Sequence, residues 1–374
     1  MKNIVIAPDS FKDSLTASQA ANIMQRAVLD IFPNCNVTKK PMADGGEGTL
    51  ETLLESSDSR RVPINCTGPL GDKIETTYGI VDKNTAIIEY AAIAGLDLIP
   101  SNQRNPDITT SYGVGEVILD ALAQGCTSII LGLGGSSTND AGLGLLQALG
   151  LRAWDKNGTQ LSGFGKDLLE VNKVSLDCMD TRLGELDIRV ACDVDNPLRG
   201  PRGASVIYGP QKGADEEQVK QYDKGIQEFA DLIEAEIGQS YQEVAGSGAA
   251  GGIGFAMLSI GGCLVSGAKL IADASKIDSS IKQADLVITG EGKSDEQTLY
   301  GKAPGYIAIL AQSYRVPVVL ISGSLSGNLD SLRGQFSGCF SIINQPLSLE
   351  ESLNKAEELL YEQTKSVVHL MRSI

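Results

Sequence analysis

Short apolar segments rich in β-branched residues alternate with amphipathic segments near both ends of the chain. At the start, strand-like segments at Asn3–Ala7 and Val37–Lys40 flank Thr16–Ile31, where apolar residues recur at helical spacing. The last third repeats this order, with strand-like segments at 286–289, 316–322 and 339–343 and a helical segment at 303–313. Such alternation predicts βα units that form a largely parallel sheet.

The middle of the chain has a different pattern. Between Arg61 and Ala94, extended segments are joined by turn signals such as Gly68-Pro69, which predicts a section rich in β-hairpins. Beyond it, the pattern predicts a helix at 115–124, strands at 128–133 and 188–192, and a charged amphipathic helix at 214–237. We therefore predict an α/β protein of two domains. Residues 1–64 and 266–374 form a discontinuous, doubly wound domain, and residues 65–265 form an inserted second α/β domain.

Length and composition agree with two domains and exclude several classes of partner. The 374 residues exceed the roughly 250–300 at which single cores stop growing. A formal charge of −16 argues against nucleic acid or an anionic membrane as the partner, because both require a basic face. No segment approaches the ~18 consecutive apolar residues of a membrane span. Seven cysteines without a CxxC pair indicate a reduced, cytoplasmic protein.

The chain contains a single histidine, His369, which lies in a helix-like segment near the C-terminus. We interpret it as an ordinary helix residue. A Ser-His-Asp hydrolase, a His-ligated zinc enzyme and a Cys-His protease all need a histidine at the reacting centre, so these classes are disfavoured. Any proton acceptor must then be a carboxylate or a lysine.

Five loops share one design, in which an apolar segment ends in small residues and carboxylates. They are Ala7–Lys12, Ala43–Thr49, Gly132–Asp140, Ala191–Asn196 and Gly290–Asp295. Because the carboxyl ends of the strands line the ligand crevice in doubly wound sheets, we expect these loops to converge on one cleft.

Two of these loops carry specific chemical hypotheses. In Gly132–Asp140, glycines and hydroxyls lie between a predicted strand and a predicted helix at 141–149. This order places backbone N–H groups and a helix dipole together, which suits an anion such as phosphate, although a plain turn has the same composition. Asp193 and Asp195 flank one residue at a predicted strand end, so they point to the same side and either bind a divalent ion or form an exposed turn.

Two further motifs resemble nucleotide-binding sequences and fail on inspection. Gly292-Lys293-Ser294 matches the end of a Walker A loop, but the glycine required six residues before the lysine is Val287. A Gly-x-Gly-x-x-Gly match occurs at Gly246–Gly251, but the segment before it is polar rather than an apolar strand. We expect this second motif to be a small-residue segment packed closely on a neighbour.

Six long motifs, in the same order along nearly the whole chain, make the sequence resemble the bacterial class I glycerate kinases, or glycerate 2-kinases. They are IAPDSFKDSLTA at 6–17, ADGGEGT at 43–49, GLGGSSTNDAG at 132–142, ACDVDNPLRGPRGAS at 191–205, YGPQKGA at 208–214 and ITGEGKSDEQTLYGKAP at 288–304. The resemblance implies a Rossmann- or flavodoxin-like discontinuous domain and ATP-dependent phosphorylation of D-glycerate. Mg²⁺ is expected as the second cofactor, because phosphoryl transfer requires charge neutralisation and positioning but no histidine.

With this resemblance, each loop receives an expected role. The expected catalytic residues are Asp193, Asp195, Lys293 and Asp295, with Asp193 and Asp195 also the candidate metal ligands. Glycerate is expected to contact Ser10, Lys12, Asp44 and Glu47. Nucleotide phosphates are expected at Gly134, Gly135, Ser136, Asn139 and Lys302, and Lys212 is a further cation able to neutralise phosphate or carboxylate.

Transfer to the 2-hydroxyl, giving 2-phosphoglycerate, is the leading expectation. The alternatives are a 3-phosphoglycerate product, a kinase of another small hydroxy acid, an NAD-dependent oxidoreductase based on Gly246–Gly251, and a non-catalytic protein that binds a small ligand.

Overall fold

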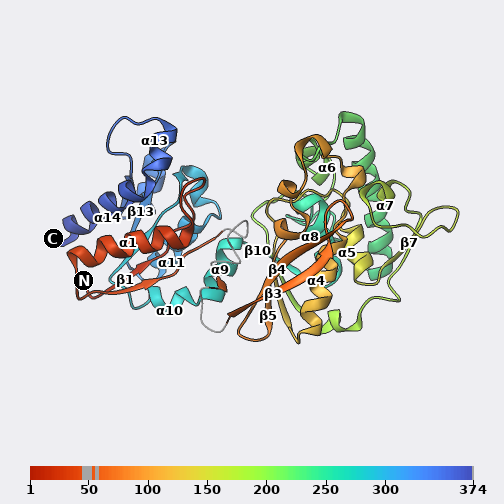
Figure 1. Ribbon diagram of the computed structural model, residues 1–374, viewed down its shortest axis with the longest axis horizontal. Helices are drawn as coiled ribbons and strands as arrows, with labels where there is room; N and C mark the ends of the chain where they lie inside the picture. Colours follow the sequence, from red (N-terminus) through yellow and green to blue (C-terminus); the bar gives the residue numbers. More distant parts are fainter. Residues whose placement is uncertain (44–52, 55–58, 373–374) are drawn as a thin grey trace. The chain divides into compact units, whose positions relative to one another are not determined.

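The computed structural model describes residues 1–43, 53–54 and 59–372, and the chain folds into two compact units (Figure 1). The first unit contains the described residues up to Ala43, Leu53, and the chain from Ser266 onward. The second unit contains the described residues from Leu54 to Val265. Strand β3, Ser59–Thr67, therefore lies wholly in the second unit, whereas the predicted boundary after residue 64 divides it.

A five-stranded parallel sheet forms the centre of the first unit, in the order β15-β13-β11-β1-β2. Its strands are β1 (Asn3–Ile6), β2 (Asn36–Lys39), β11 (Leu286–Thr289), β13 (Val318–Ser322) and β15 (Gly338–Ser341). Counted within this unit, the strand order is 2-1-3-4-5, which is the flavodoxin-like order, with its topological switch point between β1 and β11. The predicted doubly wound α/β class is confirmed.

Two helices of the first unit, α1 (Ala17–Ile31) and α11 (Ala303–Ser313), lie where the sequence pattern predicts them, and further helices accompany them. The further helices are α9 (Gly267–Ser275), α10 (Ile277–Ile281), α12 (Leu329–Arg333), α13 (Leu349–Asn354) and α14 (Ala356–Arg372). Thr16 begins α1 through a capping box with Gln19. Helix α1 lies beside α14, and both pack on a core formed by Ile4, Ile6 and Met24 with their neighbours (Figure 1).

The second unit contains a six-stranded mixed sheet in the order β10-β9-β6-β5-β4-β3. Its remaining strands are β4 (Lys73–Val81), β5 (Thr85–Glu89), β6 (Ser128–Gly132), β9 (Asp187–Ala191) and β10 (Cys263–Val265), and a separate two-stranded sheet pairs β7 (Arg152–Trp154) with β8 (Lys173–Ser175). Strands β3, β4 and β5 pair antiparallel, which confirms the predicted hairpins, whereas β5, β6, β9 and β10 are parallel.

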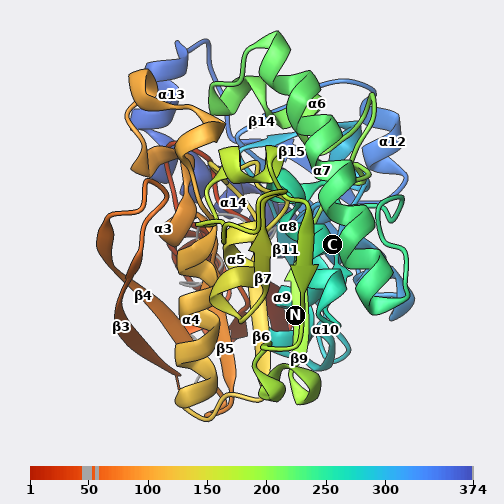
Figure 2. The ribbon, with the colours of Figure 1, turned by 90° about the vertical axis from the view of Figure 1, so that its right-hand side faces the viewer.

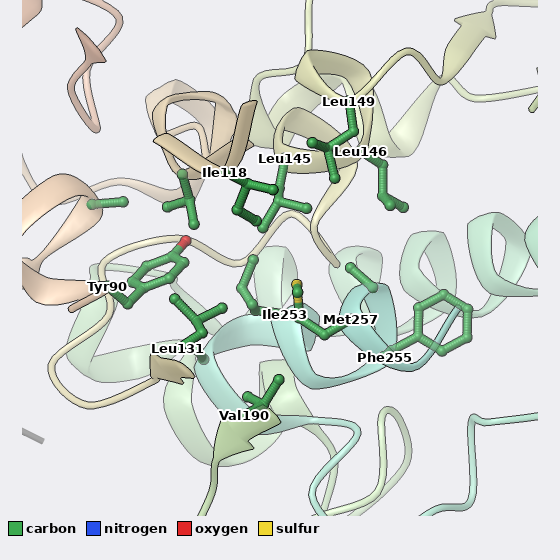
Figure 3. Packing of buried hydrophobic residues seen from close by; sticks show 14 of the residues in the cluster. Tyr90, Ile118, Leu131, Leu145, Leu146, Leu149, Val190, Ile253, Phe255 and Met257 are labelled. Carbon is green, nitrogen blue, oxygen red and sulfur yellow. The ribbon is translucent and has the colours of Figure 1, made fainter. Parts of the chain in front are cut away.

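Helices cover the second sheet and bury its core (Figure 2). They are α3 (Ala91–Ala94), α4 (Tyr112–Ala123), α5 (Leu143–Ala148), α6 (Ala204–Tyr208), α7 (Glu216–Ile237) and α8 (Ala249–Ser259). Side chains of α4, α5 and α8 meet β6 in this core, where Ile118, Leu145 and Ile253 pack near Leu131 (Figure 3). Within the described part of the chain, no helix has the length and apolar character needed to span a membrane.

Candidate functional site

In the first unit, two of the predicted loops lie side by side at the switch point of the sheet. The loop after β1 runs from Ala7 to Lys12, and the loop after β11 begins at Gly290. Asp9 donates its backbone N–H to the Gly290 carbonyl at 2.8 Å, and a Cβ added to Gly292 would lie 3.0 Å from the backbone nitrogen of Lys12. The structure therefore brings exposed Ser10 and Lys12 next to the segment that carries Lys293. These loops occupy the position where doubly wound sheets bind ligands.

Glu291 is the centre of the hydrogen bonding within this pair of loops. It is only 7% exposed, and its Oε1 atom accepts hydrogen bonds from the Ser294 hydroxyl at 2.9 Å and the Thr298 hydroxyl at 2.6 Å. Its Oε2 atom lies 3.5 Å from the Nζ atom of Lys302, at the N-terminus of α11. A buried carboxylate with these partners fixes the loop and also sets the position of Lys302.

Lys293 and Asp295 follow Glu291 and have different surroundings. Lys293 is exposed on the short strand β12 (Lys293–Ser294), which pairs with β14 (Ser324–Leu325). Asp295 instead accepts a hydrogen bond from the Gln297 backbone N–H at 2.9 Å and caps the 3₁₀ helix Glu296–Leu299. The ammonium of Lys293 is thus available to an anion, whereas the carboxylate of Asp295 already stabilises a helix end.

In the second unit, a buried lysine supports the glycine-rich loop that follows β6. Gly135 adopts a left-handed φ of 68° at the exposed tip of this loop. The Nζ atom of Lys212 donates to the Ser136 hydroxyl at 2.9 Å and to the Thr138 carbonyl at 2.6 Å. Lys212 is only 1% exposed, and this burial lowers the pKa of its ammonium group to about 7. The buried amine therefore contacts the loop at Ser136 and Thr138, next to the glycine tip in the sequence.

The N-terminus of the helix after this loop is occupied by the protein's own carboxylate. Asp140 is fully buried and accepts hydrogen bonds from the backbone N–H groups of Ser111, Gly142 and Gly144 and from the Ser111 hydroxyl. Burial raises the pKa of Asp140, and these donors act against that rise. The prediction that this helix end offers its N–H groups to phosphate is wrong, because Asp140 already accepts from two of them. The predicted helix is also shorter than expected and begins at Leu143.

Asn139 faces the interior of the second unit. Its side chain is fully buried, and its Nδ2 atom donates to the hydroxyl of Ser205 on α6 at 2.9 Å. Its Oδ1 atom is buried and has no hydrogen-bond partner among the described residues. The unsatisfied group is therefore a buried acceptor, which an ionised phosphate oxygen, itself an acceptor, cannot satisfy.

Asp193 and Asp195 do not belong to a strand, contrary to the prediction that they lie at a strand end and point to the same side. Strand β9 ends at Ala191, and the chain from Cys192 to Pro197 is irregular, so strand alternation does not set the direction of these side chains. Asp195 forms an ion pair with Arg202 at 2.7 Å, and this partner lowers the pKa of Asp195. Within the described residues, no three His, Cys, Asp or Glu side chains gather as a metal-binding group. Asp193 is exposed and lies beside this ion pair in sequence.

Three other expectations have different outcomes. Asp44 and Glu47 lie outside the described residues. His369 lies on an exposed position of α14, as expected of an ordinary helix residue. The Gly246–Gly251 segment follows no strand and packs closely as expected: a Cβ on Gly248 would lie 2.2 Å from the Pro197 carbonyl oxygen.

Comparison with known proteins decides the family. The model of the glycerate kinase family matches residues 4–372. This chain belongs to the glycerate kinase family. It is 41% identical over 370 residues to a glycerate kinase from Halalkalibacterium halodurans, a match that covers 98% of this chain and 97% of the relative. It is also 40% identical over 367 residues to the glycerate 2-kinase of Escherichia coli K12, covering 97% and 96% of the two chains.

A solved structure agrees with this membership of the glycerate kinase family. A crystal structure from Salmonella typhimurium LT2, of a protein assigned as glycerate kinase 2, matches with a TM-score of 0.91 and 40% identity. The match covers 100% of this chain and 98% of the other. The family resemblance, the phosphotransferase class and the two-domain α/β architecture expected from the sequence are confirmed.

Three buried or partly buried charged residues, Glu291, Asp140 and Arg104, have unusual surroundings in the structure, and the sequence pattern assigned no role to them. Glu291 and Asp140 lie within the motifs 288–304 and 132–142. They differ from ordinary loop carboxylates only in being buried and in accepting several hydrogen bonds. Arg104 is the third: its Nε atom is buried without a hydrogen-bond partner among the described residues, and its carbonyl would lie 2.0 Å from a Cβ on Gly213, beside Lys212. No sequence pattern distinguishes such an arginine from one in a surface ion pair.

Proposed function

We propose that this chain transfers the γ-phosphoryl group of ATP to the 2-hydroxyl of D-glycerate and releases 2-phosphoglycerate and ADP. Membership of the glycerate kinase family supports the reaction class, and the similarity to a glycerate 2-kinase supports the position of transfer. The observation that carries the proposal is the adjacency of the Ala7–Lys12 and Gly290–Lys293 loops at the switch point of a doubly wound sheet.

In this proposal, the first unit supplies cations and a hydroxyl. Ser10 and Lys12 bind glycerate, with the Lys12 ammonium on the glycerate carboxylate. Lys293 is exposed and contacts the phosphoryl group during transfer, where a cation gains most because negative charge redistributes in the transition state. Lys302, oriented by Glu291, binds a nucleotide phosphate. Asp295 keeps its capping position and orders the loop that carries Lys293.

The second unit supplies the loop for the nucleotide phosphates. Gly134, Gly135 and Ser136 approach the phosphates through backbone N–H groups and the Ser136 hydroxyl. Asn139 is fully buried, so its proposed role is to support the phosphate-binding loop through its hydrogen bond to Ser205 rather than to contact the nucleotide. Asp44 and Glu47 remain proposed glycerate contacts.

Asp193 is the proposed proton acceptor, because the ion pair with Arg202 lowers the pKa of Asp195 and makes Asp195 a weaker base than an ordinary carboxylate. When the 2-hydroxyl oxygen of glycerate bonds to the γ-phosphorus, the bond from that phosphorus to the β-phosphate bridging oxygen breaks. The hydroxyl proton passes to the Asp193 carboxylate, and ADP leaves. A base in loose phosphoryl transfer acts chiefly by orienting the hydroxyl, so a carboxylate of ordinary acidity is sufficient.

The donor set among the described residues fits Mg²⁺ bound mainly by substrate. Mg²⁺ usually keeps several waters and takes one or two protein carboxylates together with substrate phosphates, so it needs no cluster of three carboxylates. With Asp193 as the proton acceptor, Asp195 after release from Arg202 is the proposed ligand of this kind. Bound Mg²⁺ would neutralise phosphate charge during transfer.

A coupled ADP-release assay on the purified chain tests the proposal. D-Glycerate, L-glycerate, glycolate and lactate are offered separately with MgATP, and ³¹P NMR identifies the position of the phosphate in the product. We expect ADP release that depends on D-glycerate and a phosphate on the 2-hydroxyl. Release that depends on another hydroxy acid would redirect the substrate assignment, a 3-phosphoglycerate product would correct the position, and release that ignores every acid would refute the kinase assignment.

A further inference from the structure

Lys212 is a buried cation that has no direct ion-pair partner among the described residues. Among the described residues, its hydrogen-bond partners are the Ser136 hydroxyl and the Thr138 carbonyl, both in the loop after β6. Burying an ammonium group is costly unless it is paired and hydrogen-bonded, and here neither acceptor carries a charge. The charged group that favours its protonated form is the buried carboxylate of Asp140. Because burying Lys212 is costly, we expect its role to lie in the loop that contains both of its hydrogen-bond partners, Ser136 and Thr138.

The loop above Lys212 is held by side chains from several elements. The Tyr90 hydroxyl bonds the Thr138 hydroxyl at 2.6 Å, and the Thr138 carbonyl, besides accepting from Lys212, would lie 2.0 Å from a Cβ on Gly251. The Ala141 backbone N–H donates to the Gly251 carbonyl at 2.9 Å. Thr138 is therefore fixed from the sheet side and from α8, whereas the contact of Lys212 with Ser136 reaches toward the exposed tip at Gly135.

From this geometry we infer that Lys212 is a positioning residue for phosphate binding, which holds Ser136 and the Gly134–Ser136 turn in their anion-binding shape and places a positive charge beneath them. The inference rests on the proposed function, in which this loop binds the phosphates of ATP. It differs from the sequence expectation for Lys212, because a side chain that is 1% exposed and bonded to the loop does not contact the phosphate itself. Its action passes through Ser136.

The matched experiment replaces Lys212 with Met, whose unbranched side chain is one atom shorter and carries no charge. Lys224→Met is the control, because this substitution removes the same charge from an exposed side chain on α7 of the same unit. For each protein we would measure the Kd for MgATP by calorimetry, kcat, the KM for ATP and glycerate separately, and thermal unfolding through Trp154, the single tryptophan, which also lies in the second unit.

We expect Lys212→Met to weaken MgATP binding by roughly 10–100-fold, the usual effect of removing a group that orients a direct ligand contact, with an unchanged KM for glycerate. The control should match the wild type. Adding Ser136→Ala to each background provides a double-mutant cycle: if Lys212 acts through Ser136, the serine substitution should matter less once Lys212 is gone. Wild-type affinity in Lys212→Met, or fully additive effects in the cycle, would overturn the inference.

A second measurement uses the wild type alone and is decisive if Lys212→Met does not fold. Phosphate groups with a second pKa of about 6 remain ionised above pH 7, while Lys212, whose pKa is about 7, loses its proton there. Of the neighbouring groups, burial raises the pKa of Tyr90 well above its ordinary value, and buried Asp140 acts on Lys212 from the loop itself. MgATP affinity should therefore fall above pH 7, by at most about tenfold per pH unit. Affinity that stays constant from pH 7 to 9 would contradict the inference.

These outcomes separate the inference from the function on which it rests. A wild-type chain that neither binds MgATP nor releases ADP with glycerate would refute the proposed function. A wild-type chain that does both, alongside a folded Lys212→Met that behaves identically, would leave the function intact and refute the role of Lys212.

Discussion

Replacing Asp140 with Asn should destabilise the second unit strongly while leaving the shape of the side chain unchanged. The Oδ2 atom of Asp140 accepts from the Ser111 backbone N–H at 3.0 Å, the Ser111 hydroxyl at 2.6 Å and the Gly144 N–H at 3.3 Å, while Oδ1 accepts from the Gly142 N–H at 3.1 Å. An asparagine has one acceptor oxygen. If that oxygen takes the Oδ2 position, the NH₂ group of the asparagine faces the Gly142 N–H. Both groups are hydrogen-bond donors, so neither satisfies the other.

The magnitude follows from these bonds. A buried donor left without an acceptor costs about 1–3 kcal/mol, and hydrogen bonds to a charged group are worth about 1.5–3 kcal/mol, roughly twice the neutral value. Asparagine loses one acceptor and weakens the remaining bonds, but it also avoids burying a charge, the effect that raises the pKa of Asp140. We therefore expect Asp140→Asn to lower the free energy of unfolding of the second unit by about 2–4 kcal/mol.

Urea denaturation followed through Trp154 fluorescence checks this value, because the single tryptophan lies in β7 of the second unit. Asp155→Asn is the matched control. Asp155 also accepts two backbone N–H bonds, from Asn157 and Thr159 at 2.8 Å each, but on an exposed turn where water can replace the lost acceptor. A loss below about 0.5 kcal/mol in Asp140→Asn, or equal losses in the two variants, would refute the view that burial makes this carboxylate structural.

Four further outcomes are expected. Lys293→Ala should lower kcat by roughly 10²–10³-fold, and a raised KM at normal kcat in steady-state kinetics would make Lys293 a binding residue instead. Asp193→Asn should lose activity that added Mg²⁺ or Mn²⁺ does not restore, as expected of a base, whereas Asp195→Asn should lose activity that these metals partly restore, as expected of a metal ligand; full activity in both removes the pair from the mechanism. Gly251→Ala, at a φ of 73° against a carbonyl 2.0 Å from its Cβ, should cost about 2–4 kcal/mol by urea denaturation, and an unchanged midpoint would contradict the packing. The pKa of Lys212 falls from 10.5 to about 7 on folding, so between these pH values the unfolded chain binds one more proton than the folded chain. The free energy of unfolding of the wild type should therefore rise with pH relative to Lys212→Met, by at most about 5 kcal/mol. Parallel stability–pH curves for the two proteins would exclude the pKa shift.

The sequence predicted the elements well where one periodicity dominated a segment. Helix α11 was expected at 303–313 and occurs there, and β11 was expected at 286–289 and occurs there. The three apolar residues of β1, Ile4 to Ile6, are buried, and Thr16 with Gln19 forms the capping box that fixes the start of α1. In these cases the local signal and the tertiary environment agree, so local sequence was sufficient.

The candidate site was less predictable because its hydrogen-bond partners come from distant parts of the chain. Asp193 and Asp195 were expected to share a strand face, but β9 ends before them and Arg202, seven residues away, takes Asp195. The local sequence pattern indicates roughly where a strand ends. It does not indicate which side chain a carboxylate in the following loop will contact. The period-two argument holds only while the backbone remains in the sheet.

The loop after β6 shows the same limit most clearly. Its composition correctly indicated a strand, a glycine turn and a helix, and this order ordinarily exposes helix N–H groups to an anion. In this chain the anion is Asp140, which stands two residues before Gly142 and also accepts from Ser111, 29 residues earlier in the sequence. The cation of the loop, Lys212, comes from 76 residues beyond Ser136 and lies beneath it. Under the proposed function, a ligand would therefore meet this loop at its exposed glycine tip rather than at the helix end, because Asp140 already accepts from the N–H groups of Gly142 and Gly144.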